Sequence, residues 1–323
     1  MTIHLLATGG TIAGKRLPSG EVAPGLTAGE IVARMPSVPS GVSVTAEDFM
    51  QIASGFIGFA EMLGIAKRVR EISGAGSADG VIITHGTGTL EQTAYFLDVT
   101  LAGESPVVVT GAMRNPTLPS DDGPLNLLNA LHVAASPDSR GLGVLVTMNG
   151  RIHAARDVMK VHSMHVDAFQ SPEFGPIGSI DEQYVFYARR PFKRLPAVMP
   201  EQVTARVEWV PYAVDSGDLL LEAALGTRVD GLVVEGGRMG GHRLDLLTEL
   251  MARGVTVVLA NPYPAGRLHR DTYRHKGGEA HLLELGFIYA GTPALKARIK
   301  LAVLLSAGLG RDRIRELFHM EWQ

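Results

Sequence analysis

The chain has 323 residues, of which 46% are hydrophobic and 20% are charged, a composition typical of soluble globular proteins rather than of disordered or fibrous ones. Its formal net charge of −3 gives no electrostatic reason to expect a nucleic acid or an anionic membrane as partner, and its lack of cysteine excludes disulfides, thiolate nucleophiles and cysteine-bound metals. No apolar run approaches the roughly 20 residues that a membrane helix needs, and the first residues show no secretory signal, so we expect a cytoplasmic protein.

The first half of the chain alternates strands with helices. Short runs rich in valine, isoleucine, leucine and threonine predict buried strands at residues 3–8, 80–84, 106–110 and 143–148. Apolar residues at helical spacing predict a helix over residues 59–72, and a second helix that begins after Asp122 as N-cap, with Pro124 in its first turn. This alternation predicts a mainly parallel sheet that is covered on both faces.

Residues 189–201 have a different character, with several prolines and basic residues and no clear period. We place a linker at residues 191–205, between an N-terminal catalytic α/β domain (1–190) and a smaller C-terminal α/β domain (206–323). The pattern then resumes, with strands predicted at 231–234 and 255–260, a helix at 244–252 and a long helix after Thr292-Pro293. The expected fold is two α/β domains, the larger with a mainly parallel, flavodoxin-like sheet and the smaller with a short parallel sheet.

Two glycine-rich loops follow predicted strands, at residues 8–14 (TGGTIAG) and 84–89 (THGTGT). Ligands of parallel α/β sheets bind at the carboxyl ends of strands, and glycines let the backbone and its N–H groups approach them. A hydroxyl held in such a loop can attack a carbonyl while N–H groups stabilise the oxyanion. Tight turns that support helices are the alternative; a nucleotide site is disfavoured because the G-x-G-x-x-G and P-loop spacings are missing.

Five segments, in order along nearly the whole chain, resemble the bacterial-type L-asparaginase family. They are residues 5–14 (LLATGGTIAG), 80–98 (GVIITHGTGTLEQTAYFLD), 107–114 (VVVTGAMR), 121–130 (DDGPLNLLNA) and 155–160 (ARDVMK). The resemblance implies two α/β domains, hydrolysis of a small-molecule amide such as L-asparagine, no metal or organic cofactor, and assembly as a homodimer or homotetramer.

The resemblance also implies the roles of particular residues. Thr11 matches the acylated nucleophile, Thr87 the second catalytic threonine and Lys160 the lysine that interacts with it. The matching substrate-binding positions are Gly10, Ser54, Gly86, Gly88, Ala112 and Glu279, the last in the chain's own site or in that of a neighbouring subunit. A buried lysine beside a hydroxyl is chemically reasonable because desolvation lowers its pKa, although most lysines are solvated surface charges. His85 corresponds to a structural position and is not taken as a general base.

The chain departs from the family pattern around the substrate. Gly88 stands where family members have an aspartate, and Gly55 follows Ser54 where a glutamine or aspartate is common. Residues 15–30 contain no tyrosine, although the family's flexible lid usually carries one, and residues 234–242 lack the asparagine expected near the site. Most of the missing groups hold the α-ammonium of an amino-acid substrate in the family.

Three hypotheses therefore stay open. The chain is an L-asparaginase, with or without glutaminase activity, whose amino-group contacts are rebuilt from other residues. Alternatively, it is an amidase of the same fold for a small carboxylate-bearing amide or imide without an α-amino group, which Ser54 together with Phe56 and Phe59 would suit. The third hypothesis is a catalytically silent, ligand-binding homologue.

Overall fold

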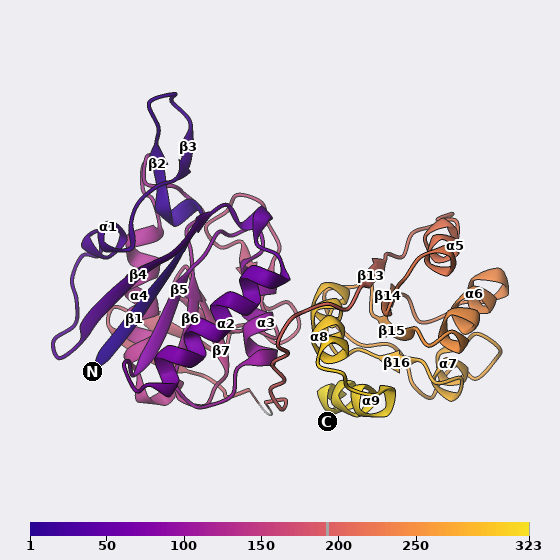
Figure 1. Ribbon diagram of the computed structural model, residues 1–323. Coiled ribbons are helices and arrows are strands. Elements are labelled where there is room, and N and C mark those ends of the chain that lie inside the picture. The colour runs from indigo at the N-terminus through magenta and orange to yellow at the C-terminus, as the bar shows by residue number, and fades with distance from the viewer. Residues whose placement is uncertain (192–193, 323) are drawn as a thin grey trace. The chain divides into compact units, whose positions relative to one another are not determined.

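The chain folds into two α/β units, which divide between Arg194 and Leu195 (Figure 1). The computed structural model describes residues 1–191 and 194–322. The first unit is Met1–Arg194 and the second is Leu195–Gln323. The predicted linker at 191–205 spans this division; residues 192 and 193 within it lie outside the described residues, and its extent stays a prediction.

An eight-stranded sheet forms the centre of the first unit. Five parallel strands lie side by side in the order β4 (Ser43–Ile52), β1 (Thr2–Gly9), β5 (Gly80–Thr84), β6 (Val107–Thr110) and β7 (Val144–Met148). If these five strands are numbered 1 to 5 as they follow one another along the chain, their order in the sheet is 2-1-3-4-5, which is the flavodoxin-like order. Three antiparallel strands extend the sheet beyond β7: β8 (Arg151–Ala154), β11 (Gly178–Asp181) and β12 (Tyr184–Tyr187). The mainly parallel, flavodoxin-like sheet is therefore confirmed.

Helices cover both faces of this sheet, as Figure 1 shows. α1 (Ala28–Ala33) and α4 (Gly123–Ala135) lie on one face, and α2 (Phe59–Gly74) and α3 (Leu90–Thr100) lie on the other. Alternate residues of β1 point to opposite faces, so Ile3, Leu5 and Ala7 join the core beneath α1 and α4, while Leu6 is buried on the α2 and α3 side. Burial on both faces explains why these strands are continuous apolar runs.

Asp122 occupies the predicted N-cap position of α4, but its carboxylate does not cap the helix. It accepts the backbone N–H groups of Met113 and Arg114 at 2.8–3.0 Å, in the loop that follows β6. It also accepts a hydrogen bond from the amide of Asn126, one turn into α4, at 2.9 Å. Asp122 thus fastens the loop after β6 to the start of α4.

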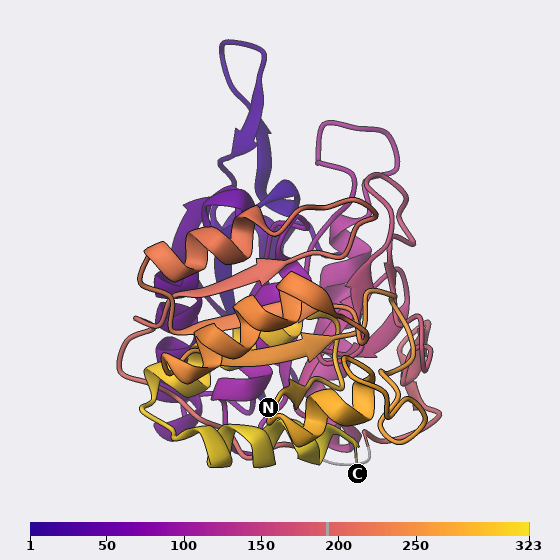
Figure 2. The ribbon, with the colours of Figure 1, turned by 90° about the vertical axis from the view of Figure 1, so that its right-hand side faces the viewer.

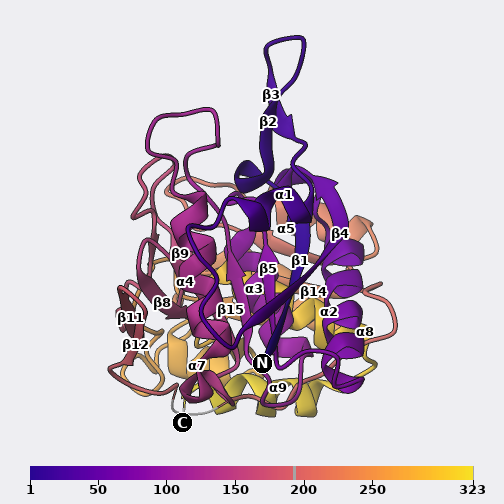
Figure 3. The ribbon, with the colours of Figure 1, turned by 90° about the vertical axis from the view of Figure 1, so that its left-hand side faces the viewer.

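Two small antiparallel sheets stand apart from the main sheet. The hairpin of β2 (Gly14–Arg16) and β3 (Val22–Pro24) projects from the end of the unit at which β1 finishes (Figure 3). The second pair joins β9 (Met159–Lys160) to β10 (Phe169–Gln170). Both pairs add segments near the carboxyl ends of the parallel strands.

The second unit is built on a four-stranded parallel sheet. Its strand order is β13 (Val207–Val210), β14 (Gly231–Glu235), β15 (Thr256–Ala260) and β16 (Ile288–Tyr289). Figure 2 turns three helices on one face toward the viewer: α5 (Leu219–Gly226), α6 (Gly241–Ala252) and α7 (Glu279–Glu284). α8 (Ala294–Ser306) and α9 (Arg311–His319) lie on the other face. The predicted short parallel sheet is therefore confirmed.

In both units, none of the helices that the structure describes is long and apolar enough to cross a membrane.

Candidate active site

A pocket of about 300 Å³ lies in the first unit, where the parallel strands reach their carboxyl ends. The loops after β1, β4, β5 and β6 and the strand β3 all contribute to it. Its lining residues are Gly10, Thr11, Gly14, Val22, Ala23, Pro24, Ala53, Ser54, Gly86, Thr87, Gly88 and Asn115. The two threonines of the glycine-rich loops therefore share one pocket with Ser54.

The two glycine-rich loops touch through their backbones, at Gly10 and Gly86. A Cβ atom built on Gly10 would lie 2.3 Å from both the Cα and the N of Gly86, a separation that real Cβ atoms essentially never show. Gly10 also has a φ of +81°, in the region that favours glycine. Glycine at both positions thus lets the loops cross closely enough to bring Thr11 and Thr87 into the same pocket.

Thr87 and Lys160 form a direct contact in the structure. Lys160 Nζ donates a hydrogen bond to Thr87 Oγ1 at 2.8 Å. Thr87 is buried and Lys160 is partly buried, and this burial lowers the pKa of the Lys160 ammonium, while the negative charge of Glu91 acts in the opposite direction. A lysine whose pKa is lowered in this way is better able to take a proton that passes through the threonine hydroxyl.

Ser54 fills the space next to Gly88. Its Oγ accepts the backbone N–H of Gly88 at 3.2 Å, and its carbonyl oxygen accepts the Thr89 hydroxyl at 2.8 Å. A Cβ atom on Gly88 would lie 2.9 Å from Ser54 Oγ, whereas a Cβ atom on Gly55 would meet nothing within 4 Å. An aspartate at position 88 would therefore require Ser54 to move, while position 55 faces open space.

We expect alanine at positions 88 and 55 to have different effects. Gly88→Ala pushes Ser54 Oγ from its place. Because the family resemblance assigns Ser54 to the substrate carboxylate, we expect loss of that hydrogen bond to raise KM by about tenfold or more. Gly55→Ala adds the same methyl group next to open space, and its KM should stay within about twofold of wild type. Steady-state kinetics of both variants test this; equal KM changes would show that the Ser54–Gly88 contact does not shape the substrate site.

Two predicted site residues do not line the pocket. Ala112 is fully buried, in the loop after β6. Glu279 belongs to the second unit, where it is the first residue of α7 and is buried, with its Oε1 3.8 Å from Arg238 Nε. Its Oε2 has no hydrogen-bond partner within the part of the chain that the structure describes.

The aromatic residues expected to make the site less polar lie elsewhere. Phe56 is 80% exposed, and the ring of Phe59 packs against Phe96 with 6.1 Å between ring centroids. Neither side chain lines the pocket. The expectation that these two rings contact a less polar substrate is therefore wrong, because the Phe56 side chain faces solvent and Phe59, the first residue of α2, packs against α3.

Two residues near the pocket were missed by sequence reasoning. Asn115 lines the pocket, and its Oδ1 accepts the backbone N–H and the hydroxyl of Thr117 at 2.9 and 2.7 Å. Glu91 accepts the backbone N–H of Lys160 at 2.6 Å. Both residues could have been predicted from their positions, because Asn115 lies in the loop after a parallel strand and Glu91 lies in the first turn of the helix that follows the Thr87 loop.

His85 supports the Thr87 loop from inside the protein. It is fully buried, and desolvation lowers its pKa to about 4, so the imidazole is neutral near pH 7. Its Nδ1 lies 2.8 Å from the carbonyl oxygen of Gly86, a contact in which the neutral ring donates the hydrogen bond. This arrangement fits a structural residue that fixes the loop and not a general base at the pocket.

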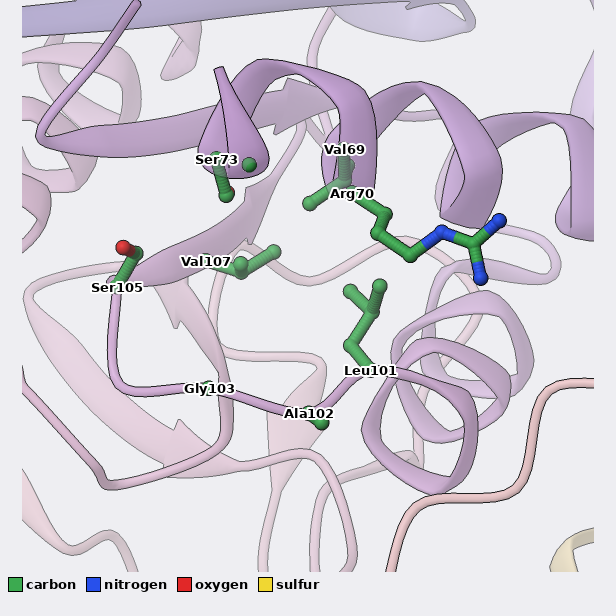
Figure 4. Close-up of a pocket in the computed structure, with 9 residues that line it drawn as sticks. Val69, Arg70, Ser73, Leu101, Ala102, Gly103, Ser105 and Val107 are labelled. Atoms are coloured by element: carbon green, nitrogen blue, oxygen red, sulfur yellow. The ribbon is translucent and has the colours of Figure 1, made fainter. Parts of the chain in front are cut away.

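A second pocket, of about 270 Å³, lies at the amino end of β6, between α2 and the segment after α3 (Figure 4). Of the described residues that line it, only Arg70 is charged, and its side chain extends away from Ser73 and Ser105. This pocket does not gather polar groups around one point, so the pocket with the two threonines is the better candidate for chemistry.

The chain is similar to known proteins over nearly its whole length. Two family models match the chain: "Asparaginase, N-terminal" over residues 2–193 and "Glutaminase/Asparaginase C-terminal domain" over residues 206–318. An L-asparaginase of Bacillus licheniformis is 35% identical to the chain, in a match that covers 94% of this chain and 95% of the relative. A probable L-asparaginase of Deinococcus radiodurans is 40% identical, in a match that covers 98% of this chain and 96% of the relative. The crystal structure of a probable cytoplasmic L-asparaginase from Campylobacter jejuni superimposes on the chain with a TM-score of 0.85 and 32% sequence identity. The match covers 98% of this chain and 99% of the Campylobacter jejuni chain. The chain therefore belongs to the bacterial-type L-asparaginase family.

Proposed function

We propose that this chain hydrolyses the side-chain amide of L-asparagine to L-aspartate and ammonia, with Thr11 as the nucleophile. The observation that carries the proposal is the pocket that Thr11 and Thr87 share, with Lys160 Nζ 2.8 Å from Thr87 Oγ1. A nucleophile, a proton acceptor and glycine-rich loops that present backbone N–H groups are the parts that acyl transfer requires.

The first step is acylation of Thr11. Its Oγ1 attacks the amide carbonyl carbon and loses its proton, and backbone N–H groups of the two loops stabilise the oxyanion. The C–N bond then breaks, and the nitrogen leaves as ammonia with the proton that the Thr11 hydroxyl has lost. The product is an ester between Thr11 and the acyl group of the substrate.

The second step is hydrolysis of this ester. Thr87 positions a water molecule, and Lys160 takes its proton through the Thr87 hydroxyl. The hydroxide attacks the ester carbonyl, and the Thr11 oxygen leaves with the proton that Lys160 returns. Since neutral Lys160 is the acceptor, the rate rises with pH through the pKa of this lysine.

We also propose that the protein works in the cytoplasm as a homodimer or homotetramer. The relative from Campylobacter jejuni is named a cytoplasmic L-asparaginase, which supports the location. In an oligomer, Glu279 would act in its own site or in that of a neighbouring subunit.

A second candidate substrate is a small amide that carries a carboxylate but no α-amino group. The contact between Ser54 and Gly88 favours it, because glycine at position 88 supplies no acidic partner for an ammonium, and a side chain there would approach the Ser54 hydroxyl to 2.9 Å. Ser54 would still bind the substrate carboxylate in either case.

Ammonia release from a panel of substrates tests the function. We expect kcat/KM for L-asparagine to exceed that for L-glutamine and for succinamate, which lacks the α-amino group. A succinamate value at least tenfold above the asparagine value would replace the first substrate with the second. If no member of the panel is hydrolysed while one of them raises the melting temperature, the chain is a ligand-binding homologue.

A further inference from the structure

Lys160 is held at both of its ends by a single segment of the chain, residues 87–91. At the side-chain end, Nζ donates to Thr87 Oγ1 at 2.8 Å, and at the main-chain end the N–H donates to Glu91 Oε2 at 2.6 Å. Glu91 lies in the first turn of α3, after the N-cap residue Thr89. Both contacts therefore tie Lys160 to the same loop and helix start.

The strand that carries Lys160 lies outside the main sheet. β9 has two residues and pairs with β10, which also has two, in a sheet separate from the main one. A two-stranded ladder of this length has little stability of its own. The bond to Glu91, which lies 69 residues earlier in the chain, links this short strand to the rigid body of the unit.

The carboxylate of Glu91 also places a negative charge close to the amine. Burial lowers the pKa of Lys160, and the charge of Glu91 partly offsets this effect. The other titratable groups on the flanking segments are His85 in the loop before α3, Arg156 and Asp157 before β9, and His162, His165 and Asp167 after it. Arg156 and Asp157 pair with each other at 3.9 Å, and most of the loop after β9 is exposed. Burial has the largest influence on the pKa of Lys160, and among the charged groups Glu91 is the one that raises it.

We propose that Glu91 is a positioning residue for the reaction: its carboxylate holds the main chain of Lys160 so that Nζ reaches Thr87, and its charge controls when Lys160 can accept a proton. This inference rests on the proposed function, in which Lys160 takes a proton from the hydrolytic water. It assigns a task to an acidic residue that lies outside the pocket lining.

Two substitutions separate the two parts of the task. Glu91→Gln keeps an oxygen that accepts the Lys160 N–H but removes the charge, so kcat at the plateau should stay within about threefold of wild type. The acidic limb of its pH–rate profile should move to lower pH by about 0.5–1 unit, because an ammonium without a neighbouring anion loses its proton more easily. Glu91→Ala removes both interactions, and kcat should fall by about 10²-fold.

Glu71→Gln is the matched control. It removes a carboxylate of the same kind that is paired with Arg68 at 3.0 Å on the exposed side of α2, away from the pocket. Its kcat and pH profile should match wild type. An unshifted acidic limb in Glu91→Gln, or a wild-type kcat in Glu91→Ala, would overturn the proposal.

A direct titration of Lys160 gives a readout that does not need turnover. The ¹³Cε resonance of Lys160, assigned by its loss in Lys160→Gln, is followed against pH in the wild type and in Glu91→Gln. A lower midpoint in Glu91→Gln is the expected result, and an unchanged midpoint rejects the role of the charge. If the wild type releases no ammonia from asparagine, the proposed function fails, and this titration still decides the inference about Glu91. If Glu91→Ala does not fold, Glu91→Gln carries the test alone.

Discussion

Thr11→Ala is expected to lower kcat for ammonia release by at least about 10⁴-fold, because the substitution removes the atom that attacks the amide. Thr11 is only partly buried and lines the pocket, so the loss of its hydroxyl and methyl groups leaves no cavity in the core. The melting temperature should therefore stay close to that of the wild type. Ammonia release and thermal unfolding, measured on the same preparation, check both statements.

Thr11→Ser is the chemical control for this prediction. It keeps a hydroxyl at the same position and should retain a substantial part of the activity. A complementary measurement uses Thr87→Ala, in which hydrolysis of the ester is expected to be slow: mass spectrometry should find the acyl group of asparagine on the peptide that contains Thr11. If Thr11→Ala keeps more than a tenth of the wild-type kcat, the nucleophile has been assigned wrongly.

The strands that sequence reasoning found are those buried on both faces. β1, β5, β6 and β7 lie in the middle of the sheet, where most positions are buried, and their runs of mainly apolar residues are easy to recognise. β4 was missed because it is an edge strand whose positions are largely exposed or half-buried and include Glu47 and Asp48. Its apolar and polar residues do not alternate regularly enough to distinguish a strand from a polar loop in the sequence.

The candidate site was predictable where it depends on strand ends, and not where it depends on packing between distant segments. A loop after a parallel strand lies at the ligand-binding edge wherever it occurs, and in the structure Thr11 and Thr87 line one pocket at this edge. The Ser54–Gly88 and Glu91–Lys160 hydrogen bonds join residues 34 and 69 positions apart. No local pattern encodes such a contact, and it follows only from how the loops are packed.

Gly10→Ala is expected to have the largest effect on the structure of the site. The methyl group would lie 2.3 Å from the Cα and N atoms of Gly86, and these backbone atoms cannot rotate away as a flexible side chain can. The loops must therefore separate, and the substitution also places a side chain at a φ of +81°. We expect a loss of about 3 kcal/mol or more in the free energy of unfolding and a fall in kcat/KM of at least about 10²-fold.

Gly20→Ala isolates the cost of the backbone conformation from the cost of the contact. Gly20 has a φ of +90°, close to that of Gly10, but a Cβ atom there would meet nothing within 4 Å. This variant should lose about 1 kcal/mol from the φ value alone. Because the two substitutions add the same atom at similar φ, the difference between their urea midpoints measures the contact between the Thr11 and Thr87 loops. Equal midpoints would mean that the loops can separate at little cost, and the close approach of Gly10 and Gly86 would then not be what holds the two threonines in one pocket.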